Sequence, residues 1–175
     1  MSGSEVLLIG GRAGVGKSSV GHELHARLSE AGVRHCLIEG DLLDLAYPAP
    51  QEHNLAERNL AAMWSNYRAL GYRRMIYTNT ASVLPAVADQ LTAAMGHAPA
   101  AIGILLTCTD ETARQRLSRR EIGTALERHL HRSKHMAERL DREAPAWVHR
   151  VGTDHRTVTD IAAEIVTRTG WADIR

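Results

Sequence analysis

The chain carries the sequence GRAGVGKS at residues 11–18, which matches the pattern G-x-x-x-x-G-K-[ST]. In this pattern the glycines let successive backbone N–H groups curl around the phosphates of a nucleotide. The lysine reaches the β- and γ-phosphates, and the hydroxyl of the last residue binds Mg²⁺. The motif constrains the fold strongly, because such a loop joins a strand to the first turn of a helix.

The residues on both sides of the loop supply this context. Residues 5–9, EVLLI, form a short apolar run typical of a buried strand. Behind the loop, Val20, Leu24 and Leu28 recur with the spacing of one helix face, and Gly32 can end that helix. The order strand, loop and helix favours a nucleoside triphosphate site over a glycine-rich turn without a ligand.

The loop residues therefore receive specific predicted roles. Lys17 is predicted to be a catalytic cation, and Ser18 is predicted to be a Mg²⁺ ligand. The predicted nucleotide-binding residues are consecutive: Gly11, Arg12, Ala13, Gly14, Val15, Gly16, Lys17, Ser18 and Ser19.

Size and composition predict one globular domain over residues 1–175, with 44% hydrophobic and 23% charged residues. The net charge of +1 argues against a nucleic-acid partner. No apolar stretch approaches the ~20 residues of a membrane helix, and no basic segment precedes the first predicted strand. We therefore expect a cytoplasmic protein that contacts no membrane. We also expect it to be a monomer or a homodimer.

Apolar runs alternate with helical stripes along the chain, which predicts an α/β fold with a parallel sheet. The predicted strands are residues 5–9, 35–39, 74–78, 101–107 and 147–151. Besides the helix after the loop, helices are predicted at 54–70, 84–95, 109–120, 124–140 and 157–169. Thr124 and Thr157 have the sequence context of N-caps. These elements make one three-layer αβα domain.

The second predicted strand is followed by a carboxylate at Asp41, within the sequence EGD. In a parallel sheet this end of the strand meets the same crevice as the loop. There Asp41 can accept the proton of a substrate hydroxyl and help to order the Mg²⁺ shell, so we predict both a catalytic and a metal role. The alternative is that Asp41 caps a short segment, residues 42–47, and both roles can coexist.

Four arginines follow the fourth predicted strand: Arg114, Arg116, Arg119 and Arg120. The last three share a helix face, and like charges at this spacing destabilise a helix by a few tenths of a kcal/mol per pair. Phosphate oxygens between them would offset that cost. A solvated face with ion pairs is the alternative, which we favour for Arg114. A glycine at position 123 follows, so the segment is a candidate lid over the nucleotide.

These features, in this order, resemble the small P-loop kinases. They are the loop, the EGD strand end, the arginines at Arg116 and Arg120, and the sequence GTD at 152–154 before the Thr157-capped helix. The group includes gluconate, shikimate and adenylylsulfate kinases and chloramphenicol phosphotransferase, which share the nucleoside monophosphate kinase fold. The chain contains neither the N-K-x-D sequence of GTPases nor the Asp-Glu strand end of motor and transporter ATPases.

The resemblance implies a five-stranded parallel sheet in the order 2-3-1-4-5 and a small helical lid at about residues 116–135. It implies Mg-ATP as the donor and Asp41 as the group that activates the acceptor hydroxyl. Arg116 would bind ATP near the adenine, and Arg120 would be a catalytic residue near the transferring phosphate. Backbone groups of residues 152–155 would line the adenine.

The acceptor is not named by these motifs. Polar residues after the second and third strands are predicted to bind it: Asp44, Tyr47, Asn79 and Thr80. Met63, Trp64 and Tyr67 can shape the same pocket or pack in the core. The predicted function is transfer of the γ-phosphoryl of Mg-ATP to a hydroxyl or phosphate of a small molecule. The alternative is an ATP-binding switch, or a drug-resistance or sequestration factor, with little kinase activity.

Overall fold

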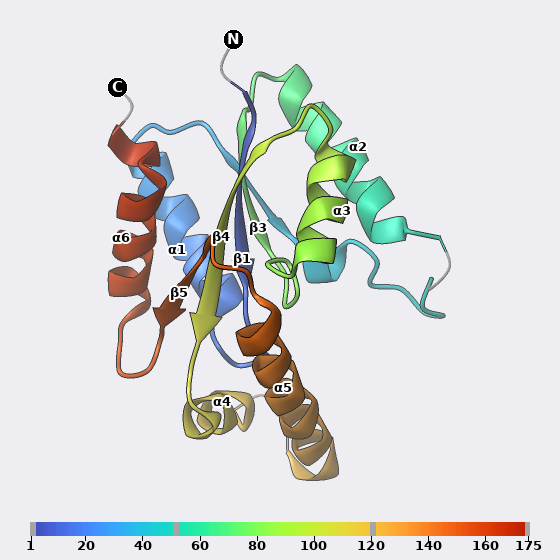
Figure 1. Cartoon of the computed structure of the whole chain (residues 1–175), viewed down its shortest axis with the longest axis vertical. Coiled ribbons are helices and arrows are strands. Elements are labelled where there is room, and N and C mark those ends of the chain that lie inside the picture. Colours follow the sequence, from blue (N-terminus) through green and yellow to red (C-terminus); the bar gives the residue numbers. More distant parts are fainter. Residues whose placement is uncertain (1–2, 51–52, 120–121, 174–175) are drawn as a thin grey trace.

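The computed structural model describes residues 3–50, 53–119 and 122–173. Five strands form one parallel sheet in the order β2-β3-β1-β4-β5 (Figure 1). The strands are β1 (Glu5–Gly10), β2 (Cys36–Glu39), β3 (Arg74–Thr78), β4 (Ala100–Thr107) and β5 (Val148–Gly152). The expected fold class and the sheet order that the resemblance implied are both confirmed.

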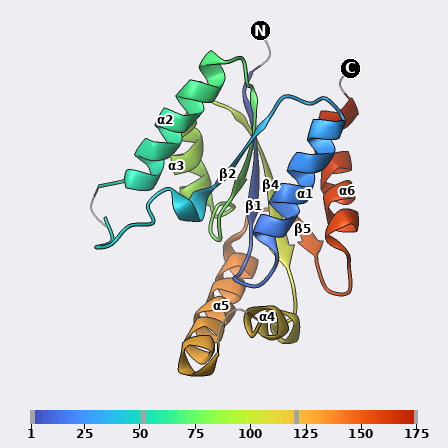
Figure 2. The same ribbon diagram turned by 180° about the vertical axis from the view of Figure 1, so that it is seen from behind.

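Helices cover both faces of the sheet and also extend beyond one end of it. The helices α1 (Lys17–Glu30) and α6 (Val158–Thr169) lie on one face, and α2 (Leu55–Ala69) and α3 (Pro85–Met95) lie on the other (Figures 1 and 2). The helices α4 (Asp110–Leu117) and α5 (Gly123–Glu143) lie at the carboxyl ends of the strands. Two short 3₁₀ helices, η1 (Gly40–Leu42) and η2 (Trp171–Asp173), follow β2 and α6.

The central strand β1 shows why the sheet needs both helical layers. Val6 and Leu8 point into the core cluster under α2 and α3, whereas Leu7 and Ile9 point into the cluster under α1 and α6. All four side chains are fully buried. Successive side chains of a strand face opposite sides, so an uninterrupted apolar run requires cover on both.

Three predicted helix ends have different outcomes. Thr157 is the N-cap of α6, and its hydroxyl accepts a hydrogen bond from the N–H of Asp160 at 3.1 Å, as predicted. The prediction for Thr124 is wrong, because α5 begins one residue earlier and its N-cap residue, Ile122, makes no side-chain capping bond. The preceding helix α4 ends at Leu117, three residues before the predicted end.

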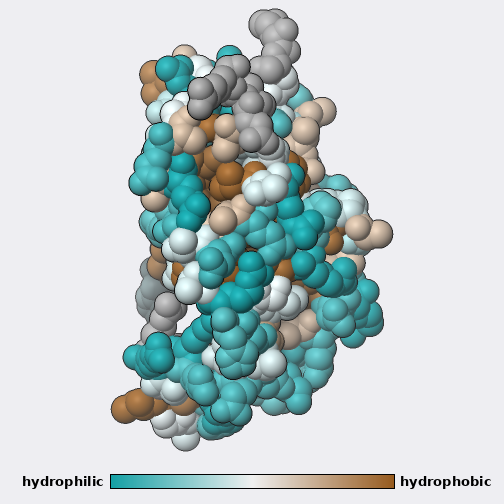
Figure 3. Space-filling model, turned by 90° about the vertical axis from the view of Figure 1, so that its left-hand side faces the viewer, coloured by the Kyte–Doolittle hydropathy of each residue, from teal (hydrophilic) through white to brown (hydrophobic). Residues whose placement is uncertain are grey.

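Figure 3 shows the side of the molecule on which α6 lies, and most of the surface there is hydrophilic. The outward positions of α6, such as Asp160, Thr167 and Arg168, are exposed. No helix within the described ranges combines the length and the apolar character that crossing a membrane requires.

Candidate active site

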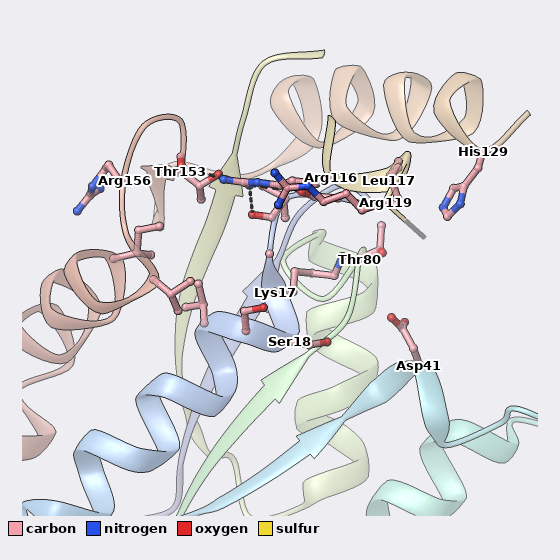
Figure 4. A pocket seen from close by; sticks show the side chains of 18 residues that line it. Lys17, Ser18, Asp41, Thr80, Arg116, Leu117, Arg119, His129, Thr153 and Arg156 are labelled. Carbon is pink, nitrogen blue, oxygen red and sulfur yellow. Dashed lines mark hydrogen bonds between the residues drawn. The ribbon is translucent and has the colours of Figure 1, made fainter. Parts of the chain in front are cut away.

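A cavity of about 520 Å³ lies at the carboxyl ends of the strands, between the glycine-rich loop and the helices α4 and α5. Figure 4 shows Lys17 and Ser18 in its middle, with Thr153 toward one end. Asp41 and His129 lie toward the other end. We call these the Thr153 end and the Asp41 end. The cavity thus offers space on both sides of the glycine-rich loop.

The loop holds its backbone in conformations that glycine adopts readily. The φ angles of Gly11, Gly14 and Gly16 are +147°, +83° and +105°. A Cβ atom at Gly14 would also lie 3.0 Å from the carbonyl oxygen of Ala113 in α4. Gly16 is the N-cap of α1 and makes no side-chain capping bond. Because the first N–H groups of a helix lack intrahelical partners, this helix end can bind a phosphate.

The Lys17 ammonium folds back onto the loop. Its Nζ donates hydrogen bonds to the carbonyl oxygens of Gly11, at 2.9 Å, and Arg12, at 3.3 Å. Burial lowers the pKa of Lys17, and the negative charge of Asp41 opposes this shift. A phosphate bound at the loop would supply the counter-charge that favours the ammonium form.

Ser18 lies beside a carboxylate that the sequence analysis did not select. Its hydroxyl donates to Oε2 of Glu39 at 3.2 Å, and Oε1 of Glu39 is 2.9 Å from Nε2 of His22. Within the described ranges, no three His, Cys, Asp or Glu side chains group into a metal site. A hydroxyl and one carboxylate do suit a Mg²⁺ ion that takes its other ligands from phosphates and water.

Asp41 points into the cavity and is held by a neighbouring strand end. Its Oδ1 accepts a hydrogen bond from Nδ2 of Asn79 at 2.7 Å, and Oδ1 of Asn79 accepts from the N–H of Ala81 at 3.0 Å. The interpretation of Asp41 as an N-cap is not supported, because Glu39 occupies the N-cap position of η1 and residues 43–47 form no helix. Asp41 itself lies within η1, and Asn79 holds its carboxylate at the cavity.

The predicted acceptor residues divide into two groups. Thr80 lines the Asp41 end, and Asn79 contributes by holding Asp41. Asp44 and Tyr47 do not line the cavity, and the side chain of Tyr47 is fully exposed. The segment after η1 runs outward instead of returning over the cavity, as Figure 1 shows beside α2.

The aromatic residues of α2 belong to the core rather than to this cavity. Trp64 is buried in the cluster under α2 and α3, and Tyr67 packs against that cluster. Met63 lies on the same helix with its side chain partly exposed. The core-packing interpretation of this helix is the one that the structure supports.

Arg116 joins the loop to the Thr153 end. One guanidinium nitrogen donates to the carbonyl oxygens of Gly14, at 3.3 Å, and Val15, at 2.9 Å, and to Oγ1 of Thr153 at 3.0 Å. The other terminal nitrogen donates to the carbonyl oxygen of Thr153 at 3.2 Å. With these donors engaged in its plane, the guanidinium lines the cavity where an adenine is expected.

The other arginines near α4 lie in different surroundings. Arg119 lines the cavity, whereas Arg114 pairs with Glu127 at 3.0 Å on the surface. Both side chains of that pair are mostly exposed, in keeping with the solvated face favoured for Arg114. Arg120, the predicted catalytic arginine, lies outside the described residues.

The side chain of Arg12 does not line this cavity. It is buried, and it donates to Oγ of Ser133 at 2.9 Å and to Oδ1 of Asp110. Only the backbone of Arg12 is therefore placed to support nucleotide binding.

Two residues of the site had only weak sequence signals. Glu39 is the last residue of β2, in the same EGD sequence that singled out Asp41. His129 is one of ten histidines and no motif marks it, yet it lines the Asp41 end from α5.

Neither a protein-family model nor a curated protein matches the sequence. Solved structures do match its fold. The tunicamycin resistance protein of Deinococcus radiodurans is 18% identical, with a TM-score of 0.66 over 95% of this chain and 96% of that one. A gluconokinase from Sinorhizobium meliloti is 20% identical, with a TM-score of 0.60 over 98% of this chain and 92% of that one.

A third match is the APS kinase of Mycobacterium tuberculosis in complex with AMPPNP and APS. It is 15% identical, with a TM-score of 0.58 over 95% of this chain and 98% of that one. At these identities the likeness concerns the fold. The chain has the fold of the small P-loop kinases.

Proposed function

From this fold, we propose that the protein is an ATP-dependent phosphotransferase that moves the γ-phosphoryl of Mg-ATP to a hydroxyl, or a phosphate, of a small molecule. The observation that carries the proposal is the position of Asp41. Its carboxylate shares one cavity with Lys17 and the phosphate-binding loop, and Asn79 holds it there. Nucleotide binding is also supported by the fold shared with a kinase that was solved with AMPPNP.

The residues in and beside the cavity would have different roles in the reaction. Backbone N–H groups of the loop and the Lys17 ammonium would bind the β- and γ-phosphates. Ser18 and Glu39 would hold Mg²⁺, whose charge offsets that of the phosphates. The Thr153 end, which includes Arg116 and Val158, would take the adenine.

At the other end, Asp41 would accept the proton of the acceptor hydroxyl as its oxygen bonds to the γ-phosphorus. The bond between that phosphorus and the bridging oxygen breaks, and ADP leaves with the electron pair. We assign two arginines to stabilising the negative charge of the transferring phosphoryl group. They are Arg119, which lines the cavity, and Arg120. Both belong to the lid that we propose at about residues 116–135.

The test is a panel of hydroxyl compounds incubated with Mg-ATP, with coupled detection of ADP. The panel includes sugars, sugar acids, nucleosides, aminoglycosides and phenicols. It also includes tunicamycin, because a resistance protein to that compound shares the fold. ADP formation that depends on one acceptor, and that is lost in Lys17→Ala, would support the proposal. Steady ATP loss that no acceptor changes would favour the switch.

A further inference from the structure

The proposed reaction assigns no role to the buried side chain of Arg12. A P-loop accepts any residue at this position, yet Arg12 is only 4% exposed. A buried charge is costly unless it is paired and hydrogen-bonded. Arg12 meets that requirement through Asp110, the first residue of α4, and Ser133, in the middle of α5. Lys134 approaches the same carboxylate at 3.8 Å.

Ser133 forms a second bond to the loop. Its hydroxyl accepts from Nε of Arg12 and donates to the carbonyl oxygen of Ala13 at 3.0 Å. The side chain is only 3% exposed, so water does not compete freely for these bonds. Since Arg116 binds the carbonyls of Gly14 and Val15, three successive loop carbonyls accept hydrogen bonds from side chains of α4 and α5.

These bonds bear directly on the phosphate-binding N–H groups. A peptide unit is planar and nearly rigid, so the carbonyl of one residue and the N–H of the next are fixed relative to each other. A bond that orients the Ala13 carbonyl therefore also orients the N–H of Gly14. The bond to the Val15 carbonyl does the same for the N–H of Gly16, whereas the N–H of Val15 donates to the carbonyl oxygen of Arg12 at 3.3 Å within the loop. In this way α4 and α5 set the direction of donors on the opposite side of the loop.

The same two helices position side chains at the cavity. His129 lies four residues before Ser133 on one face of α5 and reaches the Asp41 end (Figure 4). Arg119 lies just beyond the end of α4 and lines the cavity as well. A shift of the loop on nucleotide binding would therefore reach both side chains through Arg12, Ser133 and Arg116.

We propose that Ser133 and Arg12 are positioning residues that couple the phosphate-binding loop to α4 and α5, so that nucleotide binding fixes Arg119 and His129 at the Asp41 end. The inference rests on the proposed function in one respect, namely that this loop binds the nucleotide. It adds that the loop orders the acceptor side of the cavity before the acceptor arrives. Ligand binding to one part of a protein can order another part when a physical contact joins them.

Hydrogen exchange measured by mass spectrometry tests this proposal with Mg-AMPPNP as the probe, so no acceptor is needed. In the unmodified protein, the nucleotide should slow exchange in loop peptides and in peptides of α5 that contain residues 129–135. In Ser133→Ala, the loop should still be protected while the protection of α5 is lost. Ser133→Thr keeps the hydroxyl and should restore it. Ser65→Ala, on exposed α2 surface, is the matched control.

Three results would contradict the proposal. Equal protection of α5 in Ser133→Ala and in the unmodified protein would show that the hydroxyl couples nothing. Loop protection without α5 protection in the unmodified protein would show that the helices do not respond. If Mg-AMPPNP protects neither segment, the nucleotide site itself is wrong, and the proposed function fails together with this inference. Circular dichroism and the Tm of each variant confirm that its fold is intact.

Discussion

At the scale of single residues, Asp41 is held by Asn79 and caps no helix in the described chain. We therefore predict that Asp41→Asn lowers kcat by about 10²–10⁴-fold, because it removes the carboxylate that we propose as the general base. ATP affinity and Tm should stay close to those of the unmodified protein. The matched control is Asp44→Asn, which changes an exposed carboxylate outside the cavity. A lower Tm with intact turnover would assign Asp41 to folding.

Glu39 carries a second prediction, because it accepts the hydrogen bond of the proposed metal ligand Ser18. Glu39→Gln removes the charge with little change in size, so it should raise the Mg²⁺ concentration needed for half-maximal ATP binding. Calorimetry at several Mg²⁺ concentrations measures this shift. Glu30→Gln, at the exposed end of α1, should leave the titration unchanged. The metal role of Glu39 would be refuted by identical titrations in the two variants.

The site residues that could be predicted from the sequence are those whose position is fixed by residues close to them in the chain. The loop and Asp41 follow from spacing along the chain, because a short motif or a strand end fixes where they lie. Tyr47 could not be placed in the same way, since nothing in the sequence states that the segment after η1 runs outward. His129 comes from a helix about 90 residues along the chain from Asp41, and only tertiary structure brings the two together.

At the scale of elements, Arg116 connects α4 to the loop and to the end of β5. Arg116→Ala should raise the KM for ATP and lower the free energy of unfolding by about 1–3 kcal/mol, since it leaves buried acceptors unpaired. Arg114→Ala removes only an exposed ion pair and should change stability by less than about 1 kcal/mol. Steady-state kinetics and urea unfolding measure both effects. A variant with unchanged KM and stability would contradict the bridging role.

Asp154 links the β5–α6 connection to the start of α4. Its carboxylate accepts hydrogen bonds from the hydroxyls of Thr112, at 2.5 Å, and Thr109, at 3.0 Å, and from the Thr109 N–H. The Thr112 bond is the main cause that lowers the pKa of Asp154 below its ordinary value of 3.8, and the bonds from Thr109 act in the same direction. A carboxyl with a lowered pKa stabilises the folded state above the unfolded-state pKa, and this contribution is lost as the pH falls through the folded-state pKa.

The lowered pKa of Asp154 leads to a prediction for the variant Asp154→Asn. The variant should have a lower Tm at about pH 7, and the difference from the unmodified protein should stay constant down to about pH 5. Below about pH 4 the difference should shrink, because the carboxyl becomes protonated in the unmodified protein. Asp89→Asn, on the exposed face of α3, is the control. A Tm difference that does not change with pH would contradict the assignment.

The elements themselves were largely predictable, because apolar runs mark strands that are buried on both faces. The Thr157 cap could be predicted because its partner lies three residues away. The start of α5 could not be predicted from the capping pattern at Thr124, since the helix already begins at Gly123. The sheet order rested on the family resemblance, because periodicity does not show which strands are neighbours.

At the scale of the whole molecule, the parallel sheet brings the carboxyl ends of β1, β2, β3 and β5 to the same edge of the sheet. The loop, Asp41, Asn79 and Thr153 follow these strands and meet at the cavity, which the region around α4 and α5 also borders. This arrangement supports the proposal of a reaction between a nucleotide and a second molecule, which would bind at the Asp41 end.

The most direct test of the phosphotransferase proposal is the destination of the γ-phosphate. The protein is incubated with Mg²⁺ and [γ-³²P]ATP in a fractionated extract of small molecules, and the labelled products are separated. We predict label in an organic acceptor, with none of that product in Lys17→Ala and about 10²–10⁴-fold less in Asp41→Asn. Label that appears only in inorganic phosphate, at the same rate in the unmodified protein and in Asp41→Asn, would contradict the proposal.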